Sequence, residues 1–211
     1  MARNQRDRIL MAVADATSDR GYAQASVEDI IARAGVSRRT FYDLFKNKED
    51  AFLAAYDEAV RRLMRSIRDD RTAERDFARR MTAGLRAFLE LLTAAPSFAR
   101  MCVVEVLAAG PQAVRRRNDA MAALAAMIED DAQRLSSRPQ SPVAVEMIVG
   151  GIYELVYSRV AAGRLDEIEG LLPEVVYATL VPFLGEEAAV AARHELLGSP
   201  AGPKSRAASA A

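Results

Sequence analysis

The residues best suited to chemistry in this chain of 211 residues lie in one short polar segment, residues 37–48. Arginine can form a bidentate pair with guanine in the major groove of DNA, and threonine can contact a thymine methyl group. Lysine and tyrosine can hold a phosphate. These residue types within so short a stretch indicate a surface that reads nucleic acid, with a solvated helical surface as the alternative. The candidate side chains are Ser37, Arg38, Arg39, Thr40, Tyr42, Lys46 and Lys48.

Local signals place this segment on the second helix of a helix-turn-helix pair. Ser26 can cap a first helix and, together with Asp29, forms a variant of the capping box. Gly35 can adopt the left-handed conformation that ends this helix, and Ser37 can cap the next one. At about 100° per residue, the apolar side of the second helix consists of Phe41, Leu44 and Phe45. The opposite side, which is free for a partner, carries Arg39, Tyr42, Asp43 and Lys46.

Gly21-Tyr22 and the stretch SVEDIIARAGVSRRTFYDLFKNKEDAFL at residues 26–53 carry a family resemblance. Residues 10–53 resemble the DNA-binding domain of the TetR family of bacterial transcriptional regulators. The resemblance implies a dimeric, all-helical regulator of transcription whose larger domain commonly senses a small molecule. It also implies phosphate contacts for Tyr42 and Lys48. The predicted DNA contacts are Ser26, Ser37, Arg38, Arg39, Thr40, Tyr42, Lys46 and Lys48.

The composition argues against several other classes of protein. Lys and Arg together number 29, as do Asp and Glu, and this zero formal charge argues against a general basic coat for nucleic acid. Cys102 is the only cysteine, which excludes an intrachain disulfide. Together with the single histidine, His194, it leaves no cluster for a structural zinc. We expect no signal peptide, no membrane span and no cofactor, and a cytoplasmic protein fits.

Elsewhere the sequence indicates only helices, so we predict an all-α chain. Hydrophobic residues recur at steps of three and four, and proline and glycine separate the periodic segments. We expect an N-terminal three-helix helix-turn-helix DNA-binding domain at residues 1–47 and a larger C-terminal helical domain for ligand binding and dimerisation at residues 48–198. Residues 199–211 are small and polar, which predicts a disordered tail. Helices are predicted at residues 3–20, 49–71, 74–95, 97–109, 112–136, 143–162 and 171–184.

Methionine and aromatic residues are frequent in the middle helices. Because methionine adapts to irregular shapes, they suggest a deformable cavity for a small apolar ligand, with ordinary core packing as the alternative. Glu105 and Tyr157 are polar groups in apolar segments and are candidates for orienting the ligand. Cys102 is either a redox or electrophile sensor or an inert buried thiol. The candidate lining residues are Met81, Phe88, Met101, Cys102, Glu105, Met127, Met147, Tyr153 and Tyr157.

Two late helices, at residues 143–162 and 171–184, are apolar on nearly all sides. A helix of this kind must be buried on every side. One face can serve the core of the chain, and the face left over can meet its copy in a second subunit across a two-fold axis. The predicted homodimer interface consists of Gly150, Ile152, Leu155, Val176, Leu180 and Phe183.

These features together predict a ligand-responsive transcriptional repressor. Two subunits would place their polar helices on a roughly palindromic double-stranded DNA operator, and a small, apolar ligand would lower the DNA affinity. An enzyme is not expected, because the acids are spread over helix surfaces and no glycine-rich phosphate loop or metal-ligand spacing is present. Two alternatives remain open: a DNA-binding regulator with a filled core and no ligand, and a helical adaptor that binds another protein.

Overall fold

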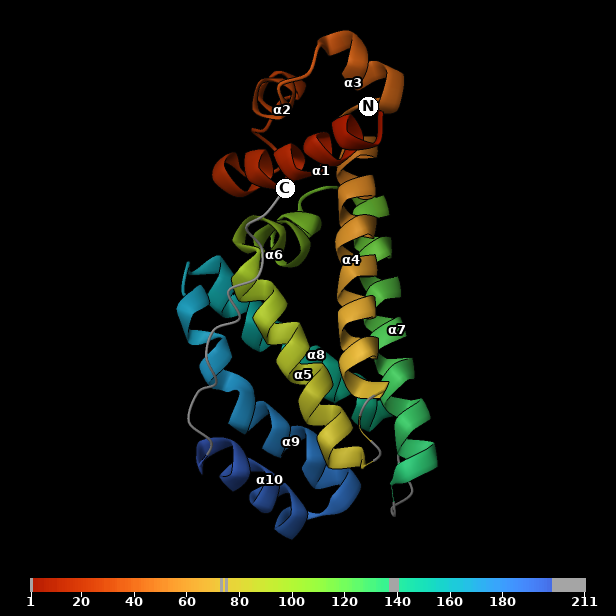
Figure 1. Cartoon of the computed structure of the whole chain (residues 1–211), viewed down its shortest axis with the longest axis vertical. Coiled ribbons are helices and arrows are strands. Elements are labelled where there is room, and N and C mark those ends of the chain that lie inside the picture. The colour runs from red at the N-terminus through yellow and green to blue at the C-terminus, as the bar shows by residue number, and fades with distance from the viewer. Residues whose placement is uncertain (1, 73, 75, 137–140, 199–211) are drawn as a thin grey trace.

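The computed structural model describes residues 2–72, 74, 76–136 and 141–198. Within these ranges every regular element is a helix, which confirms the all-α prediction (Figure 1). The expected tail at residues 199–211 lies outside the described residues. The helices α2 and α3 occupy one end of an elongated molecule, α10 lies at the other end, and the long helices α4 and α7 run between them (Figure 1).

The first three helices form the predicted helix-turn-helix unit. They are α1 (Ala2–Arg20), α2 (Val27–Ala34) and α3 (Arg38–Leu44). The Ser26 hydroxyl accepts a hydrogen bond from the Asp29 amide at 3.1 Å, and the Asp29 carboxylate accepts one from the Ser26 amide at 2.9 Å. This reciprocal pair is the capping box, and it satisfies donors that a helix start leaves free.

The turn between α2 and α3 is set by Gly35 and Ser37. Gly35 has φ 60°, a left-handed conformation that glycine adopts without steric cost, and it ends α2. The Ser37 hydroxyl then accepts a hydrogen bond from the Thr40 amide at 3.0 Å and starts α3. Phe41 and Phe45 are buried against α1 and α4, so the polar side of α3 faces outward.

The rest of the chain forms a helical body below this unit (Figure 1). Proline occupies the first turn of α6, α7, α8 and α9, where its missing amide costs no hydrogen bond. The elements are α4 (Lys48–Thr72), α5 (Phe77–Ala94), α6 (Pro96–Val103), η1 (Glu105–Leu107), α7 (Pro111–Leu135), α8 (Pro142–Ala161), η2 (Leu165–Glu167), η3 (Glu169–Leu171), α9 (Leu172–Leu184) and α10 (Glu186–Gly198).

One predicted helix is divided in the structure. Residues 97–109 were expected to be continuous, but α6 ends at Val103 and the 3-10 turn η1 follows. Glu105 begins this turn, and its carboxylate accepts a hydrogen bond from the backbone amide of Tyr22 at 2.7 Å. This long-range contact fixes the backbone in a place where sequence periodicity alone favours a continued helix.

Buried side chains form two hydrophobic clusters. The first joins α1, α2, α3 and the beginning of α4 with Met101, Val106, Ala109 and Ala113 from the α6–α7 region. The second lies among α5, α7, α8, α9 and α10. Because the first cluster includes residues of α6 and α7, the helix-turn-helix unit packs directly on the helical body.

A buried ion cluster joins α4, α5 and α7. The Asp131 carboxylate contacts the Arg71 guanidinium and accepts hydrogen bonds from Arg80 at 2.9 and 3.0 Å. A Cβ added at Gly84 would lie 2.8 Å from the Arg71 side chain, so glycine provides the space through which Arg71 passes. Burial opposes the charge on Asp131, but the two arginines outweigh it and lower its pKa.

Within the described ranges, no single helix combines the length and apolarity needed to cross a membrane. Helix α5 and the α6–η1 segment are long and apolar enough only when taken together, and the chain bends by 109° between them. Much of this pair is core: Phe77, Met81 and Leu89 of α5 and Met101 of α6 are all buried.

Candidate nucleic-acid interface and internal cavity

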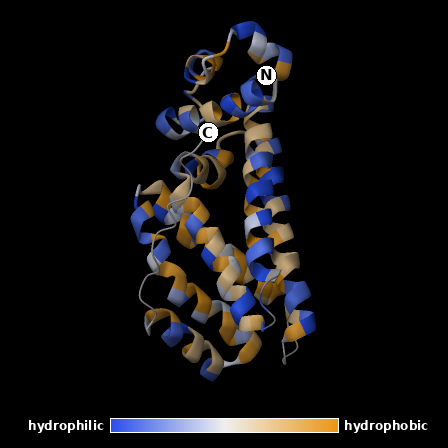
Figure 2. Ribbon diagram, in the orientation of Figure 1, coloured by the Kyte–Doolittle hydropathy of each residue, from blue (hydrophilic) through white to orange (hydrophobic). Residues whose placement is uncertain are grey.

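The outer side of α3 is polar and accessible. Arg39 is 92% exposed, and Arg38, Tyr42, Asp43 and Lys46 are also exposed. The hydropathy colouring shows hydrophilic and hydrophobic residues side by side in α2 and α3, as two-faced helices require (Figure 2). The predicted reading residues therefore share one solvent-facing surface, which is the arrangement that a recognition helix needs in a major groove.

Ion pairs on this surface orient two of its arginines. Arg39 Nε lies 3.9 Å from the Asp43 carboxylate one helical turn later. Arg38 pairs with Glu28 at the start of α2. Both pairs are exposed, so they contribute little to stability, but they hold the guanidinium groups near the outer face.

Lys48 departs from the prediction. Its ammonium group does not point outward but donates hydrogen bonds to the carbonyl oxygens of Tyr22 at 2.7 Å and Ala25 at 2.8 Å. It also lies 4.3 Å from the centre of the Tyr22 ring, and burial lowers its pKa. These hydrogen bonds connect the α1–α2 turn to the start of α4. Ser26 is likewise occupied by the capping box of α2.

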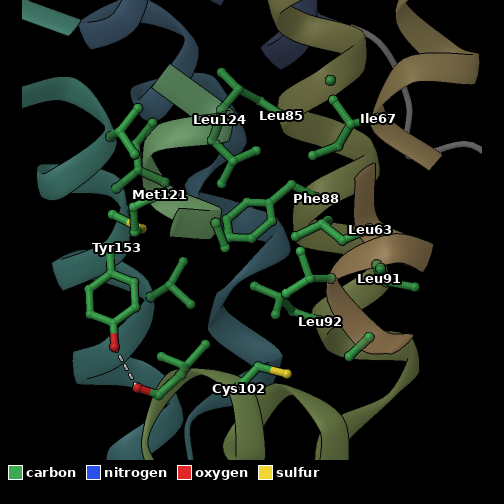
Figure 3. A pocket seen from close by; sticks show the side chains of 18 of the residues that line it. Leu63, Ile67, Leu85, Phe88, Leu91, Leu92, Cys102, Met121, Leu124 and Tyr153 are labelled. Carbon is green, nitrogen blue, oxygen red and sulfur yellow. Dashed lines mark hydrogen bonds between the residues drawn. The ribbon is translucent and has the colours of Figure 1, made fainter. Parts of the chain in front are cut away.

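An internal cavity of about 210 Å³ lies among α4, α5, α6, α7, α8 and α9. Its walls are mostly apolar, and Figure 3 shows Leu63, Ile67, Phe88, Met121 and Leu124 around the space. Cys102 and Tyr153 lie together at one end of it (Figure 3). For comparison, an apolar cavity of about 150 Å³ is large enough to take up benzene.

Five of the predicted lining residues lie in this wall: Met81, Phe88, Cys102, Met127 and Tyr153. The other four lie elsewhere. Met101, although adjacent to Cys102, points into the cluster under α1 and is fully buried there. Met147 is 72% exposed on the outside of α8, and Tyr157 stacks on Tyr153 at 6.3 Å without reaching the cavity wall.

Glu105, predicted to orient the ligand, does not line the cavity. Instead of facing the cavity, it is buried between the helical body and the helix-turn-helix unit. Its carboxylate accepts the hydrogen bond from the Tyr22 amide and lies 3.3 Å from Arg100 Nε. Glu105 therefore connects η1 to the turn that precedes α2. Nothing local in the sequence announces this contact, which spans 83 positions.

The cavity wall also contains residues that the sequence analysis does not predict as lining. Tyr56, Leu63 and Ile67 belong to the apolar stripe of α4, and Arg117 sits in a basic run at residues 115–117. Thr179 lies on a helix that was assigned to dimerisation. A buried tyrosine or threonine within an apolar stripe is the only sequence signal that singles out such positions.

Polar groups in the wall have defined environments. The Tyr153 hydroxyl donates a hydrogen bond to the carbonyl of Val103 at 2.7 Å, and the Arg117 guanidinium lies 3.9 Å from the centre of the Tyr153 ring. Burial raises the pKa of the Cys102 thiol to about 12, so the thiol stays protonated at neutral pH and is a poor nucleophile. Within the described residues, no three His, Cys, Asp or Glu side chains gather as a metal site requires.

Comparison with known proteins agrees with this geometry. Residues 9–55 match the family model of bacterial regulatory proteins, tetR family. The HTH-type transcriptional regulator EthR of Mycolicibacterium smegmatis is 30% identical over 167 residues, which cover 75% of this chain and 74% of EthR. The chain belongs to the TetR family of transcriptional regulators.

Other TetR-family proteins resemble parts of the chain or its fold. The transcriptional activator FasR of M. smegmatis is 31% identical over 88 residues, covering 42% of this chain and 40% of the activator. The fatty acid degradation regulator FadR of Bacillus halodurans has the same fold, with a TM-score of 0.74 and 22% identity over 82% of this chain and 97% of FadR. FadR of Bacillus subtilis, solved with stearoyl-CoA, has a TM-score of 0.72 and 19% identity over 85% of this chain and 98% of that protein.

The surface predicted to pair two copies of this TetR-family chain is only partly exposed. Val176, Leu180 and Phe183 are fully buried in the core beneath α9 and are unavailable to a partner. Ile152 lines the cavity. Gly150 and Leu155 are exposed on α8, where Val143 and Met147 extend the same exposed apolar strip. Of the predicted set, only Gly150 and Leu155 are exposed in the single chain, on the same helix as the exposed Val143 and Met147.

Proposed function

We propose that this TetR-family chain is a ligand-responsive repressor that binds a roughly palindromic operator as a homodimer. The observation that carries this proposal is the cavity, because its walls include α4 and α6. The same two helices contribute to the cluster that holds the helix-turn-helix unit. A ligand in the cavity therefore acts on elements that position the recognition helix.

In the DNA-bound state, we infer that α3 lies in the major groove. Arg38, Arg39 and Thr40 would contact base edges, and Tyr42 and Lys46 would contact phosphates. Their common exposure on one face supports this assignment. Ser37 remains a candidate phosphate contact at the start of α3, whereas the hydrogen bonds of Ser26 and Lys48 support structural tasks for those two residues.

Dimerisation would set the distance between two recognition helices. The exposed strip on α8 supports an isologous contact with a second copy. Added Cβ atoms at Gly150 and Gly151 would meet no atom of the same chain within 4 Å, so these glycines leave room for a close approach. The two recognition helices of the dimer, about 34 Å apart, would then enter successive major grooves on one side of the duplex.

The ligand would lower DNA affinity by a population shift. If it binds better when α4 and α6 are displaced, it favours the state in which the two heads no longer match the operator. The cavity supports this reading over a regulator with a filled core. The structure of B. subtilis FadR with stearoyl-CoA supports an apolar or acyl ligand class for a chain of this fold. FasR is a transcriptional activator, so activation is the second candidate outcome.

Selection of bound sites from random DNA duplexes tests the proposal most directly. We expect enrichment of a roughly palindromic sequence and two chains for each bound site. Gel-shift titration of the selected duplex then gives the affinity and its dependence on salt. Failure to enrich any duplex would contradict the proposal and favour the adaptor alternative, in which the same hairpin binds a protein.

A further inference from the structure

The cavity is apolar along most of its length, but its end near α6 is polar. Tyr56 of α4, Cys102 of α6, Arg117 of α7 and Tyr153 of α8 all line it. Burial raises the pKa of the Tyr56 hydroxyl, and Cys102, Tyr153 and Arg117 are among the groups close enough to shift it as well. Figure 3 shows Cys102 and Tyr153 at this end, far from Leu85 and Leu124.

Two polar side chains at this end can meet a ligand. Among the described residues, Arg117 Nε is buried and has no hydrogen-bond partner. Tyr56 is only 4% exposed to solvent and lines the cavity. A buried polar atom without a partner costs about 1–3 kcal/mol, so such atoms are normally satisfied by water or by a ligand.

The charged residues that line the cavity are all positive. Three arginines and no Asp or Glu are found among its described lining residues. Arg71 is neutralised by Asp131, and Arg62 donates a hydrogen bond to Glu58 at 3.0 Å. Arg117 forms no ion pair with any described carboxylate, and its guanidinium contacts neutral groups: it donates to the Asn118 side chain at 3.0 Å and lies against Tyr153. Arg117 is thus the lining arginine without an ion pair among the described residues, and it sits at the polar end, whereas Arg71 and Arg62 each share a carboxylate with other arginines.

We propose that the effector is an apolar monocarboxylate whose carboxylate is held by Arg117 and the Tyr56 hydroxyl while its hydrocarbon part fills the cavity. Arginine suits a planar carboxylate because it can donate two parallel hydrogen bonds. Tyr153 keeps the guanidinium in place through the contact with its ring. Scaled from a cavity of about 150 Å³ that holds benzene, the space suits a ligand of about eight heavy atoms.

This assignment deepens the proposed function and rests on it. The position of the carboxylate matters because Cys102 at the same end belongs to α6, which packs against α1. A thioester of the same acid has no free carboxylate to pair with Arg117. The polar end therefore selects the free acid over the thioester.

Calorimetric titration of the full-length chain tests the assignment, with hexanoate and octanoate as probes and the alcohol of the same chain length beside each. We expect each carboxylate to bind at least tenfold tighter than its alcohol. Octanoyl-coenzyme A is the third probe and should bind more weakly than octanoate. The same probes added to a gel shift report whether binding releases DNA.

Variants at the polar end separate charge from packing. Arg117→Gln should reduce the preference for carboxylate over alcohol to less than twofold, whereas Arg117→Lys should retain most of it. Tyr56→Phe should weaken octanoate by about three- to tenfold, the equivalent of one hydrogen bond. Arg115→Gln removes an exposed arginine two residues away and serves as the matched control with unchanged binding. Thermal unfolding of each variant reports whether it is folded.

The outcomes distinguish this inference from the proposed function. Equal binding of octanoate and octanol, both releasing DNA, would overturn the carboxylate assignment and leave the ligand-responsive repressor intact. Tighter binding of octanoyl-coenzyme A than octanoate would also overturn it. No binding by any probe would overturn the assignment and remove its support for ligand response, while the selected operator would still test DNA binding separately.

Discussion

At the scale of single residues, the exposed side of α3 is the surface that we propose reads DNA. Arg39 is 92% exposed and lies 3.9 Å from Asp43, so the carboxylate can steer the guanidinium toward one base while leaving its outer edge free. A carboxylate so close to phosphate is unfavourable in general. Its presence fits a surface that gains its selectivity from placed contacts.

Arg39→Ala should reduce the affinity for the selected operator by about 1–3 kcal/mol, because it removes a bidentate base contact. The loss should be much smaller on random duplex. Gel-shift titration on both duplexes gives the comparison, and Arg65→Ala, which alters an exposed arginine in the middle of α4, is the control. Unchanged operator affinity would contradict the orientation assigned to α3.

Lys46 and Lys48 make a matched pair with opposite expectations. Lys48→Met removes two hydrogen bonds from a charged donor and should lower the free energy of unfolding by about 1–3 kcal/mol. It should leave the salt dependence of DNA binding unchanged. Lys46→Met should leave stability intact and reduce the salt slope by about one for each protomer. A reduced slope for Lys48→Met would restore the phosphate contact to Lys48.

At the scale of elements, the most consequential contact is the one between η1 and the turn before α2. Glu105→Ala removes both the acceptor for the Tyr22 amide and the partner of Arg100. We expect a loss of about 1–3 kcal/mol in stability and faster hydrogen exchange at the Tyr22 amide. Glu105→Gln retains an acceptor oxygen and should show a smaller change. Equal exchange in both variants would argue against the linkage.

The ion cluster of α4, α5 and α7 predicts a pH dependence. The pKa of Asp131 in the folded chain is below its ordinary value of 3.8. A carboxylate of this kind contributes its stability above the unfolded pKa, and the contribution is lost as pH falls through the folded pKa. Unfolding free energies should therefore decline as pH drops below 3.8.

Asp131→Asn isolates this contribution. It leaves Arg71 buried without its counter-charge, so we expect a loss of about 3–5 kcal/mol at neutral pH. The variant should also lack the part of the acid-induced decline that belongs to Asp131. Denaturant unfolding of both chains between pH 3 and pH 7 measures the difference, and parallel curves would contradict the assignment.

Local sequence signals were sufficient for the two helices of the helix-turn-helix pair. Caps at Ser26 and Ser37 and the glycine at Gly35 determine α2 and α3 from neighbouring residues alone. The cavity was harder to predict, because adjacent residues diverge: Cys102 lines it, whereas Met101 packs under α1. In an apolar helix, periodicity does not say which neighbour each face will meet.

The same ambiguity explains the error in the predicted dimer surface. Val176, Leu180 and Phe183 follow the spacing that either an interface or a core would show. The structure assigns them to the core, and α8 presents the exposed strip instead. The packing of α10 against α9 favours the core assignment.

At the scale of the whole molecule, the exposed apolar strip on α8 is the surface that two copies would share. Met147→Glu should raise the dimer dissociation constant at least tenfold, because a charge would replace an apolar contact at the interface. Operator affinity should fall with it, since a single head makes half of the contacts. Sedimentation analysis measures the assembly, and Leu197→Glu, at another exposed apolar position, on α10, is the control.

The first hydrophobic cluster limits how the helix-turn-helix unit can be transplanted into another protein. One continuous cluster runs from Ile9 in α1 to Ala113 in α7, so the first three helices possess no independent hydrophobic interior. Severed after α3, they would expose apolar side chains that now rest on α4, α6 and the start of α7. A chimera that grafts this specificity onto a foreign sensor must bring those supports along. New effector responses and new target sequences thus have to evolve within one common set of packed side chains.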